Sequence, residues 1–241
     1  MPATNTDANR KRSSGRSAAG NSTLLMLEGD VSMRQRAKNQ MPMVLLTLLS
    51  IIQALALELL WVHITGDNTL LQLSWLSILS WLQIAVTLLG IMLIWLLYSS
   101  MTMRFSWVPS PGDSLVPIGI GVLEFTLIAC LGMDYLMPWF LILATIFGAM
   151  TAALHSIFRR ARQDPDNRAF FSITAPATRR DFYPTFAVVG ALALFGITLG
   201  VTGDQRYLAL VALIVAAAIH LYQIYLNHSR WRTAMSLKTE D

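Results

Sequence analysis

The sequence predicts an all-α, polytopic integral membrane protein with six transmembrane helices and both termini in the cytoplasm. Of the 241 residues, 54% are hydrophobic and 13% are charged, whereas about 25% of residues are charged in a typical soluble domain. Six apolar stretches are long enough for a helix to cross a bilayer core of about 30 Å. The basic residues are concentrated on one side of these stretches. Together these observations exclude a soluble globular enzyme.

The predicted spans follow one another along the chain with mostly short connections. Backbone polar groups in lipid must be bonded within their own segment, so a continuous apolar run predicts a helix. The runs do not alternate every second residue, as the strands of a membrane barrel would. The second run is longer than a straight span requires and predicts a tilted or protruding helix. The spans are Met41–Thr65, Leu70–Tyr98, Ser114–Met133, Met137–Phe158, Pro184–Thr202 and Arg206–Leu226.

The orientation follows from the distribution of positive charge. All of the 18 Lys and Arg residues except Arg206 lie on one side of the predicted spans. Because such residues in short loops resist translocation, this side is expected to face the cytoplasm. The opposite connections are short, and they contain Asp67, Asp134 and Asp204. We predict this topology for a protein of the bacterial inner membrane.

The spans divide the chain into five parts. The first part is basic and polar, so we expect a largely disordered cytoplasmic tail in which residues 22–38 favour a short interfacial helix. Its positive charge predicts contact with anionic lipid and not with nucleic acid. The parts are the tail (1–40), a four-span part (41–158), a basic cytoplasmic loop (159–183), a two-span part (184–228) and a cytoplasmic C-terminal tail (229–241).

Ionisable side chains within the spans are few, and each is a functional candidate. A charged side chain at the bilayer centre costs roughly 2.5–3.5 kcal/mol on insertion scales. In the first span, small and polar residues recur at steps of three or four and predict one polar stripe that faces protein or water. The candidate residues for a polar path are Glu58, Glu124, His220, Thr47, Ser50 and Gln83.

Two interpretations of the acidic residues remain open. A rise of 1.5 Å per residue puts Glu58 about 10 Å and Glu124 about 13 Å below the outer ends of their spans, so they can lie at similar depths. Converging carboxyls would hold one proton or a small cation. Alternatively, each is a neutral acid bonded to the backbone or to Gln83. We expect Gln53 to form an interhelical hydrogen bond, and Gly196 to serve helix packing.

Other chemistry is weakly indicated. The sequence has no Gly-rich phosphate loop, no Cys/His metal spacing and no nucleophile motif, so no catalytic residue or metal site is predicted. No cofactor is predicted either. The alternative of a b-type haem rests on His155 and His220, which are expected at similar depths in the cytoplasmic half. In the basic loop, Asp164 and Asp166 are expected to form solvated ion pairs with neighbouring arginines.

In layout, the chain resembles several small oligomeric channel families. One is a bacterial potassium-channel family whose first helix carries an Arg followed by Phe-Ser-Asp. No such tripeptide follows Arg34 or Arg36, so the resemblance covers the layout and transfers no residue. It implies a homo-oligomer. We predict a channel or carrier for a small cation or proton. The alternatives are a structural or assembly membrane protein, and a membrane enzyme or haem-binding subunit.

Overall fold

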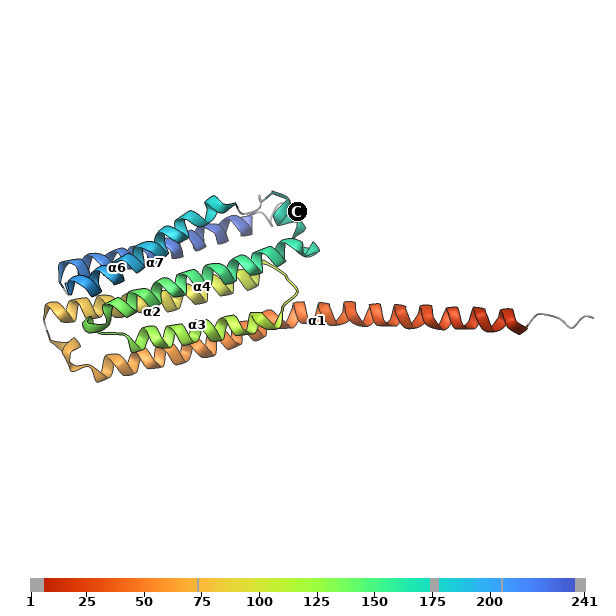
Figure 1. Ribbon diagram of the computed structural model, residues 1–241, viewed down its shortest axis with the longest axis horizontal. Helices are drawn as coiled ribbons and strands as arrows, with labels where there is room; N and C mark the ends of the chain where they lie inside the picture. Colours follow the sequence, from red (N-terminus) through yellow and green to blue (C-terminus); the bar gives the residue numbers. More distant parts are fainter. Residues whose placement is uncertain (1–6, 73, 174–177, 205, 237–241) are drawn as a thin grey trace, which may run out of the picture.

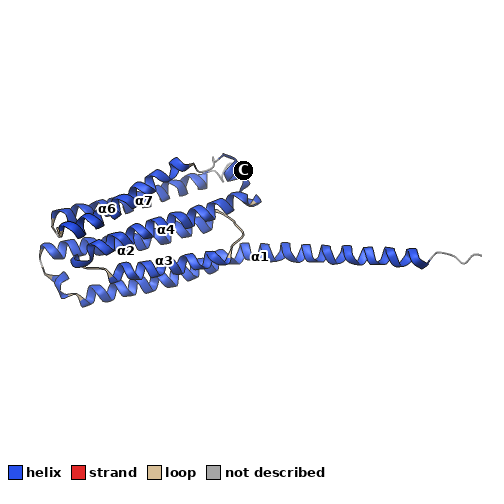
Figure 2. Cartoon of the chain, in the orientation of Figure 1, coloured by secondary structure: helices blue, strands red, loops and turns tan. Residues whose placement is uncertain are grey.

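The computed structural model describes residues 7–72, 74–173, 178–204 and 206–236. All regular structure in these residues is helical (Figure 2). Within these residues, six helices are long and apolar enough to cross a membrane, which confirms the prediction of an all-helical chain with six such helices. The long helices are α1 (Asp7–Gly66), α2 (Trp75–Arg104), α3 (Pro111–Ala129), α4 (Leu136–Gln163), α6 (Tyr183–Thr202) and α7 (Tyr207–Ser236). The short elements are η1 (Asn68–Leu71), η2 (Met133–Tyr135), η3 (Pro165–Asn167), α5 (Arg168–Ile173) and η4 (Arg179–Phe182).

The N-terminal part of α1 differs from the expected disordered tail. The helix begins at Asp7 and continues without a break to Gly66, and Figure 1 shows its first half extending away from the bundle. Helix formers such as Ala, Arg, Leu, Met and Lys are frequent before the bundle, and proline is absent from Asp7 to Met41. Pro42 lies inside the helix. Residues 1–6 of the expected tail lie outside the described residues.

Two helices extend well past the ends that hydropathy predicted. Helix α4 continues to Gln163 where the predicted span ends at Phe158, and α7 continues to Ser236 where the predicted span ends at Leu226. Hydropathy marks where side chains become polar, whereas a helix ends where its backbone hydrogen bonding ends. The two extensions differ in length, so depths counted from the predicted ends are shifted unequally.

The long helices form a ring in which each packs mainly against two neighbours. The order around the ring is α1, α3, α4, α6, α7, α2 and back to α1. Figure 1 shows the ring flattened into tiers, with α2 and α4 between the α1–α3 pair and the α6–α7 pair. The two-span part of the sequence therefore completes one bundle with the first four spans.

Small residues bring α6 close to α4. A Cβ atom at Gly196 would lie 3.0 Å from Cβ of Phe140 and 3.1 Å from the backbone oxygen of Met137. Small residues permit this approach between membrane helices. The packing role predicted for Gly196 is confirmed.

The bundle has two chemically different ends. Of the described residues, 67–72, 74, 130–135, 203–204 and 206 belong to the short-loop end, and 104–110, 159–173 and 178–182 belong to the basic end. At the short-loop end, the hydroxyl and the backbone N–H of Thr69 donate hydrogen bonds to Asp67 and lower the pKa of this carboxyl. Gly203 ends α6 with a left-handed φ of 64°.

Candidate functional site

Several large polar side chains are buried inside the bundle. Gln53 of α1 is 6% exposed, and Gln83 of α2, Glu124 of α3 and His220 of α7 are each 1% exposed. Burying such groups is costly unless they are hydrogen-bonded. We call these four residues the central polar cluster.

A hydrogen bond between α1 and α3 holds the acidic member of the cluster. Nε2 of Gln53 donates to Oε1 of Glu124 at 2.7 Å. Gly121 lies about one turn before Glu124, and a Cβ atom there would collide with Ile52 of α1, so the glycine permits the helices to approach. The expected interhelical role of Gln53 is confirmed. Oε2 of Glu124 has no hydrogen-bond partner among the described residues.

The imidazole of His220 is oriented by its own helix. Nδ1 lies 2.7 Å from the backbone oxygen of Ala216, and because a carbonyl only accepts, Nδ1 donates this hydrogen bond. The ring packs edge-on against Phe147 with centroids 5.2 Å apart. Nε2 faces Gly90 of α2, where a Cβ atom would lie 3.2 Å away. Within the described part of the chain, Nε2 has no hydrogen-bond partner.

Glu124 and His220 line one cavity between α2, α3, α4 and α7. Its volume is about 30 Å³, which is room for about one or two water molecules. The two atoms without a hydrogen-bond partner among the described residues, Oε2 of Glu124 and Nε2 of His220, are part of the side chains that line this cavity. The rest of the lining consists of one glycine and nine apolar side chains. These residues are Gly90, Ile91, Leu93, Ile94, Leu97, Leu127, Leu143, Ile146, Phe147 and Met150.

Further polar groups extend from the cavity along the inner face of α2. Toward the short-loop end, the Thr87 hydroxyl accepts from Nε1 of Trp139 at 3.2 Å, and Oε1 of Gln83 accepts from the backbone N–H of Gly132 at 3.0 Å. Toward the basic end, the buried hydroxyl of Tyr98 has no partner among the described residues. From Gln83 to Tyr98 the helix rises about 22 Å, which is most of a hydrocarbon core of about 30 Å.

The polar stripe predicted on the first span lies on the outside of the bundle. Thr47, Ser50 and Glu58 are all exposed. Helix α1 packs with its apolar face, and Gln53 belongs to that buried face. Glu58 follows Gln53 by five residues and so projects about 140° away around the helix. The structure therefore does not bring Glu58 and Glu124 together.

The structure does not bring His155 and His220 together either. His155 is exposed and packs edge-on against Phe182, with centroids 4.9 Å apart. His220 contacts Phe147, which lies eight residues, or about 12 Å, before His155 on α4. The predicted similarity in depth was wrong because α7 extends further past its predicted end than α4 does. Over the described residues, no group of three His, Cys, Asp or Glu side chains could hold a metal ion.

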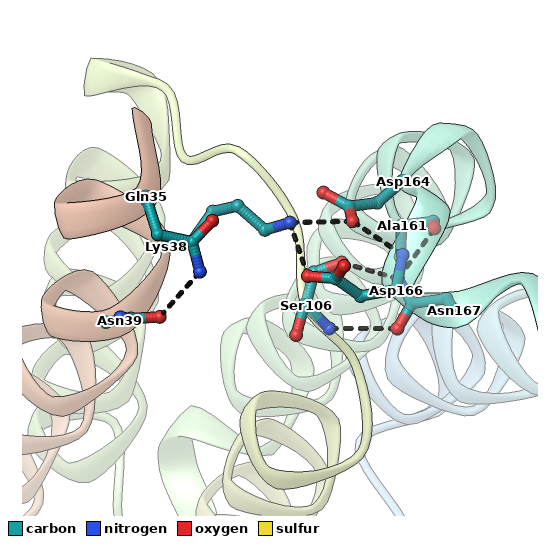
Figure 3. A network of polar contacts seen from close by, with 8 residues as sticks. All are labelled: Gln35, Lys38, Asn39, Ser106, Ala161, Asp164, Asp166 and Asn167. Atoms are coloured by element: carbon teal, nitrogen blue, oxygen red, sulfur yellow. Dashed lines mark hydrogen bonds and ion pairs between the residues drawn. The ribbon is translucent and has the colours of Figure 1, made fainter. Parts of the chain in front are cut away.

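At the basic end, Lys38 of α1 joins the loop after α4. Figure 3 shows Nζ of Lys38 between two carboxylates, at 2.7 Å from Asp164 and 2.6 Å from Asp166. Asn167 links the same loop to the segment after α2, because its Oδ1 accepts the backbone N–H of Ser106 at 3.1 Å. The expected pairing of these aspartates with arginines is replaced by pairing with a lysine that is distant in sequence.

A second ion pair at this end was not anticipated from the sequence. Asp113 of α3 is 3% exposed and pairs with Arg160 of α4 at 2.5 Å. The same carboxylate accepts the backbone N–H of Ser110 at 2.9 Å and Nε1 of Trp107 at 3.3 Å. The sequence signal was a Ser followed three residues later by an acid, which is typical of a helix start.

The chain matches no family model, and the comparisons with curated proteins and with solved structures give no match either.

Proposed function

We propose that the chain is a multi-pass membrane protein that moves protons through the centre of its helix bundle. In this proposal Glu124 and His220 take up and release the proton, and Gln83 belongs to the path toward the short-loop end. The observation that carries the proposal is the pair of ionisable side chains, each 1% exposed, on the wall of one cavity. Intramembrane carboxyl and imidazole groups are typical of proton relays.

The size of the cavity favours a proton over a larger ion. A volume of about 30 Å³ admits about one or two waters, whereas a metal cation that keeps its hydration shell needs more room. Few polar groups line the cavity, so a dehydrated cation would find few oxygen ligands. A proton needs only successive hydrogen-bonding atoms.

The neighbouring groups support a relay between the two side chains. The hydrogen bond from Nδ1 of His220 to Ala216 leaves Nε2 as the atom that accepts a proton. The hydrogen bond from Gln53 to Oε1 of Glu124 leaves Oε2 as the exchanging atom. Water in the cavity would connect the two atoms. Gln53 and Ala216 thus act as positioning residues.

The proposal includes an orientation in the membrane. The basic end would face the cytoplasm, since nearly all Lys and Arg residues lie on that side. The helical N-terminal part of α1 would then extend into the cytoplasm, and the Asp-containing short loops would face outward. Protons would pass between these two ends along the inner face of α2.

The direct test is proton flux in reconstituted liposomes. Purified protein would be placed in vesicles with an imposed pH gradient and an enclosed pH-sensitive dye. We expect the gradient to decay faster than in protein-free vesicles, while a potassium gradient is retained. Decay at the protein-free rate would contradict proton movement, and equal loss of both gradients would favour a cation channel.

A second candidate function is membrane assembly, in which the chain binds another protein without transport. The outward position of Glu58 favours it. A carboxyl facing acyl chains at the bilayer centre costs roughly 2.5–3.5 kcal/mol, and a protein neighbour with a hydrogen-bonding group would remove this cost. A homo-oligomer would place the stripe with Thr47, Ser50 and Glu58 at an interface. Chemical crosslinking of wild type and Glu58→Leu would test this function independently of flux.

A further inference from the structure

A partly buried arginine at the basic end has no acidic partner among the described residues. Arg104 is the last residue of α2, and its guanidinium lies over the rings of Phe105 and Phe170, 5.2 and 5.8 Å from their centroids. Among the described residues, its buried Nε atom has no hydrogen-bond partner, and no ion pair joins Arg104 to a carboxylate. A desolvated charge without a counter-charge is unfavourable.

A second arginine, Arg230, lies near the corresponding end of the neighbouring helix, α7. Helices α2 and α7 pack side by side and run in the same direction, beginning with Trp75 and Tyr207, whose rings are 6.2 Å apart. Near their other ends, Nδ2 of Asn227 donates to the Ser100 hydroxyl at 2.9 Å.

This register sets the positions of both arginines. Arg104 follows Ser100 by one turn, and Arg230 follows Asn227 by three residues. The two arginines therefore lie at neighbouring positions near the basic ends of α2 and α7. Two neighbouring positive charges, one of them partly buried, form a site that is complementary to an anion.

We propose that Arg104 and Arg230 bind the phosphate group of an anionic phospholipid headgroup between the basic ends of α2 and α7. The planar guanidinium presents paired N–H donors that match phosphate oxygens. Basic pockets between membrane helices on the cytoplasmic side are suited to anionic headgroups. Met103, beside Arg104, is 59% exposed and offers an apolar contact for an acyl chain. The inference requires the proposed membrane placement and is independent of proton movement.

The test measures lipid binding by the full chain in neutral detergent. Phosphatidylglycerol and phosphatidylcholine would be titrated separately, with binding followed by native mass spectrometry and by the melting temperature. We expect phosphatidylglycerol to bind at least about ten-fold more tightly, as a charge-assisted contact predicts. Equal binding of the two lipids would overturn the proposal. An equal rise in melting temperature with inorganic phosphate alone would overturn the lipid assignment and indicate a free anion.

Variants locate the site. Arg104→Gln should weaken phosphatidylglycerol binding about ten-fold, whereas Arg159→Gln removes an exposed charge of α4 at the same end and should leave it nearly unchanged. Arg230→Gln alters an exposed side chain and should also weaken binding without impairing folding. If Arg104→Gln fails to fold, the phosphatidylglycerol affinity of Arg230→Gln tests the proposed site. Equal effects of Arg230→Gln and Arg159→Gln would show general charge attraction and overturn the site.

Discussion

Gln53 and Glu124 form a hydrogen bond of 2.7 Å inside the bundle, with Nε2 of the amide donating to Oε1 of the carboxyl. The bond joins α1 to α3 and fixes the orientation of a side chain that is 1% exposed. Glu124 and His220 thus line the same cavity, and neither Oε2 of Glu124 nor Nε2 of His220 has a hydrogen-bond partner among the described residues. We expect both the stability of the bundle and its proposed function to depend on this contact.

Replacing Gln53 by leucine tests the contribution of this contact to stability. Leucine is of similar size but leaves Glu124 without its amide donor, so we expect unfolding in detergent to become easier by about 1–3 kcal/mol. Gln35→Leu is the matched control, because Gln35 lies on the same helix and is exposed. Equal stability of the two variants in a denaturant titration would show that the buried bond contributes nothing.

The ion pair between Asp113 and Arg160 should stabilise the basic end strongly. The Asp113 side chain is 4% exposed, and breaking a buried pair typically costs about 3–5 kcal/mol. We expect Asp113→Asn to lower the melting temperature markedly. Asp166→Asn is the comparison, since the Asp166 side chain is 55% exposed and should contribute at most about 1 kcal/mol. A larger effect at Asp166 would refute the packing of this end.

A methyl group at Gly90 should disturb His220. The added Cβ atom would lie 3.2 Å from Nε2, so the imidazole must shift and the cavity must change shape. We expect Gly90→Ala to lower both stability and proton flux. The control is Gly148→Ala on α4, where the added atom meets nothing within 4 Å and alanine favours the helix by up to about 1 kcal/mol. If Gly90→Ala and Gly148→Ala had the same stability and the same proton flux, the position of the His220 imidazole against Gly90 would be contradicted.

The proposed orientation predicts where reporters are accessible. A reporter inserted near Asp166 should be cytoplasmic, and a tag at Asp67 should lie outside, because nearly all basic residues belong to the side of Asp166. Protease protection in oriented membranes measures both positions. A finding that Asp166 is outside would reverse the orientation, and a finding that both sites share one side would contradict the three spans between Asp67 and Asp166.

The number of long helices was predictable because hydropathy is a property of each segment taken alone. The residues at which these helices end were less predictable. The predicted end at Leu226 falls where apolar residues become infrequent, yet α7 continues to Ser236. Continued backbone hydrogen bonding needs no apolar side chains. This difference invalidated the predicted match in depth between His155 and His220.

The arrangement of the site depended on tertiary packing that spacing does not encode. Periodicity grouped Glu58 with Ser50 on one face of the first span, but it could not determine which face meets the other helices. In the fold, the face with Leu49 and Gln53 is buried and the face with Glu58 is exposed. The partner of Glu124 is therefore Gln53. The sequence indicated that Gln53 bonds to another helix but not that its partner is Glu124.

The most direct test of the proposed function compares two carboxyls on the same protein. Glu124→Gln keeps the side-chain volume and the possibility of hydrogen bonding but removes the exchangeable acidic proton. Glu58→Gln makes the same chemical change on the outside of the bundle. Proton flux would be measured in liposomes at equal protein content, with correct insertion verified for each variant.

We predict that Glu124→Gln lowers proton flux at least about ten-fold, a general acid–base contribution being about 10²–10⁴-fold in enzymes, while Glu58→Gln retains the wild-type rate. Unchanged flux through Glu124→Gln would contradict the proton path through the central polar cluster. Loss of flux only in Glu58→Gln would instead place the path at the outer face of α1.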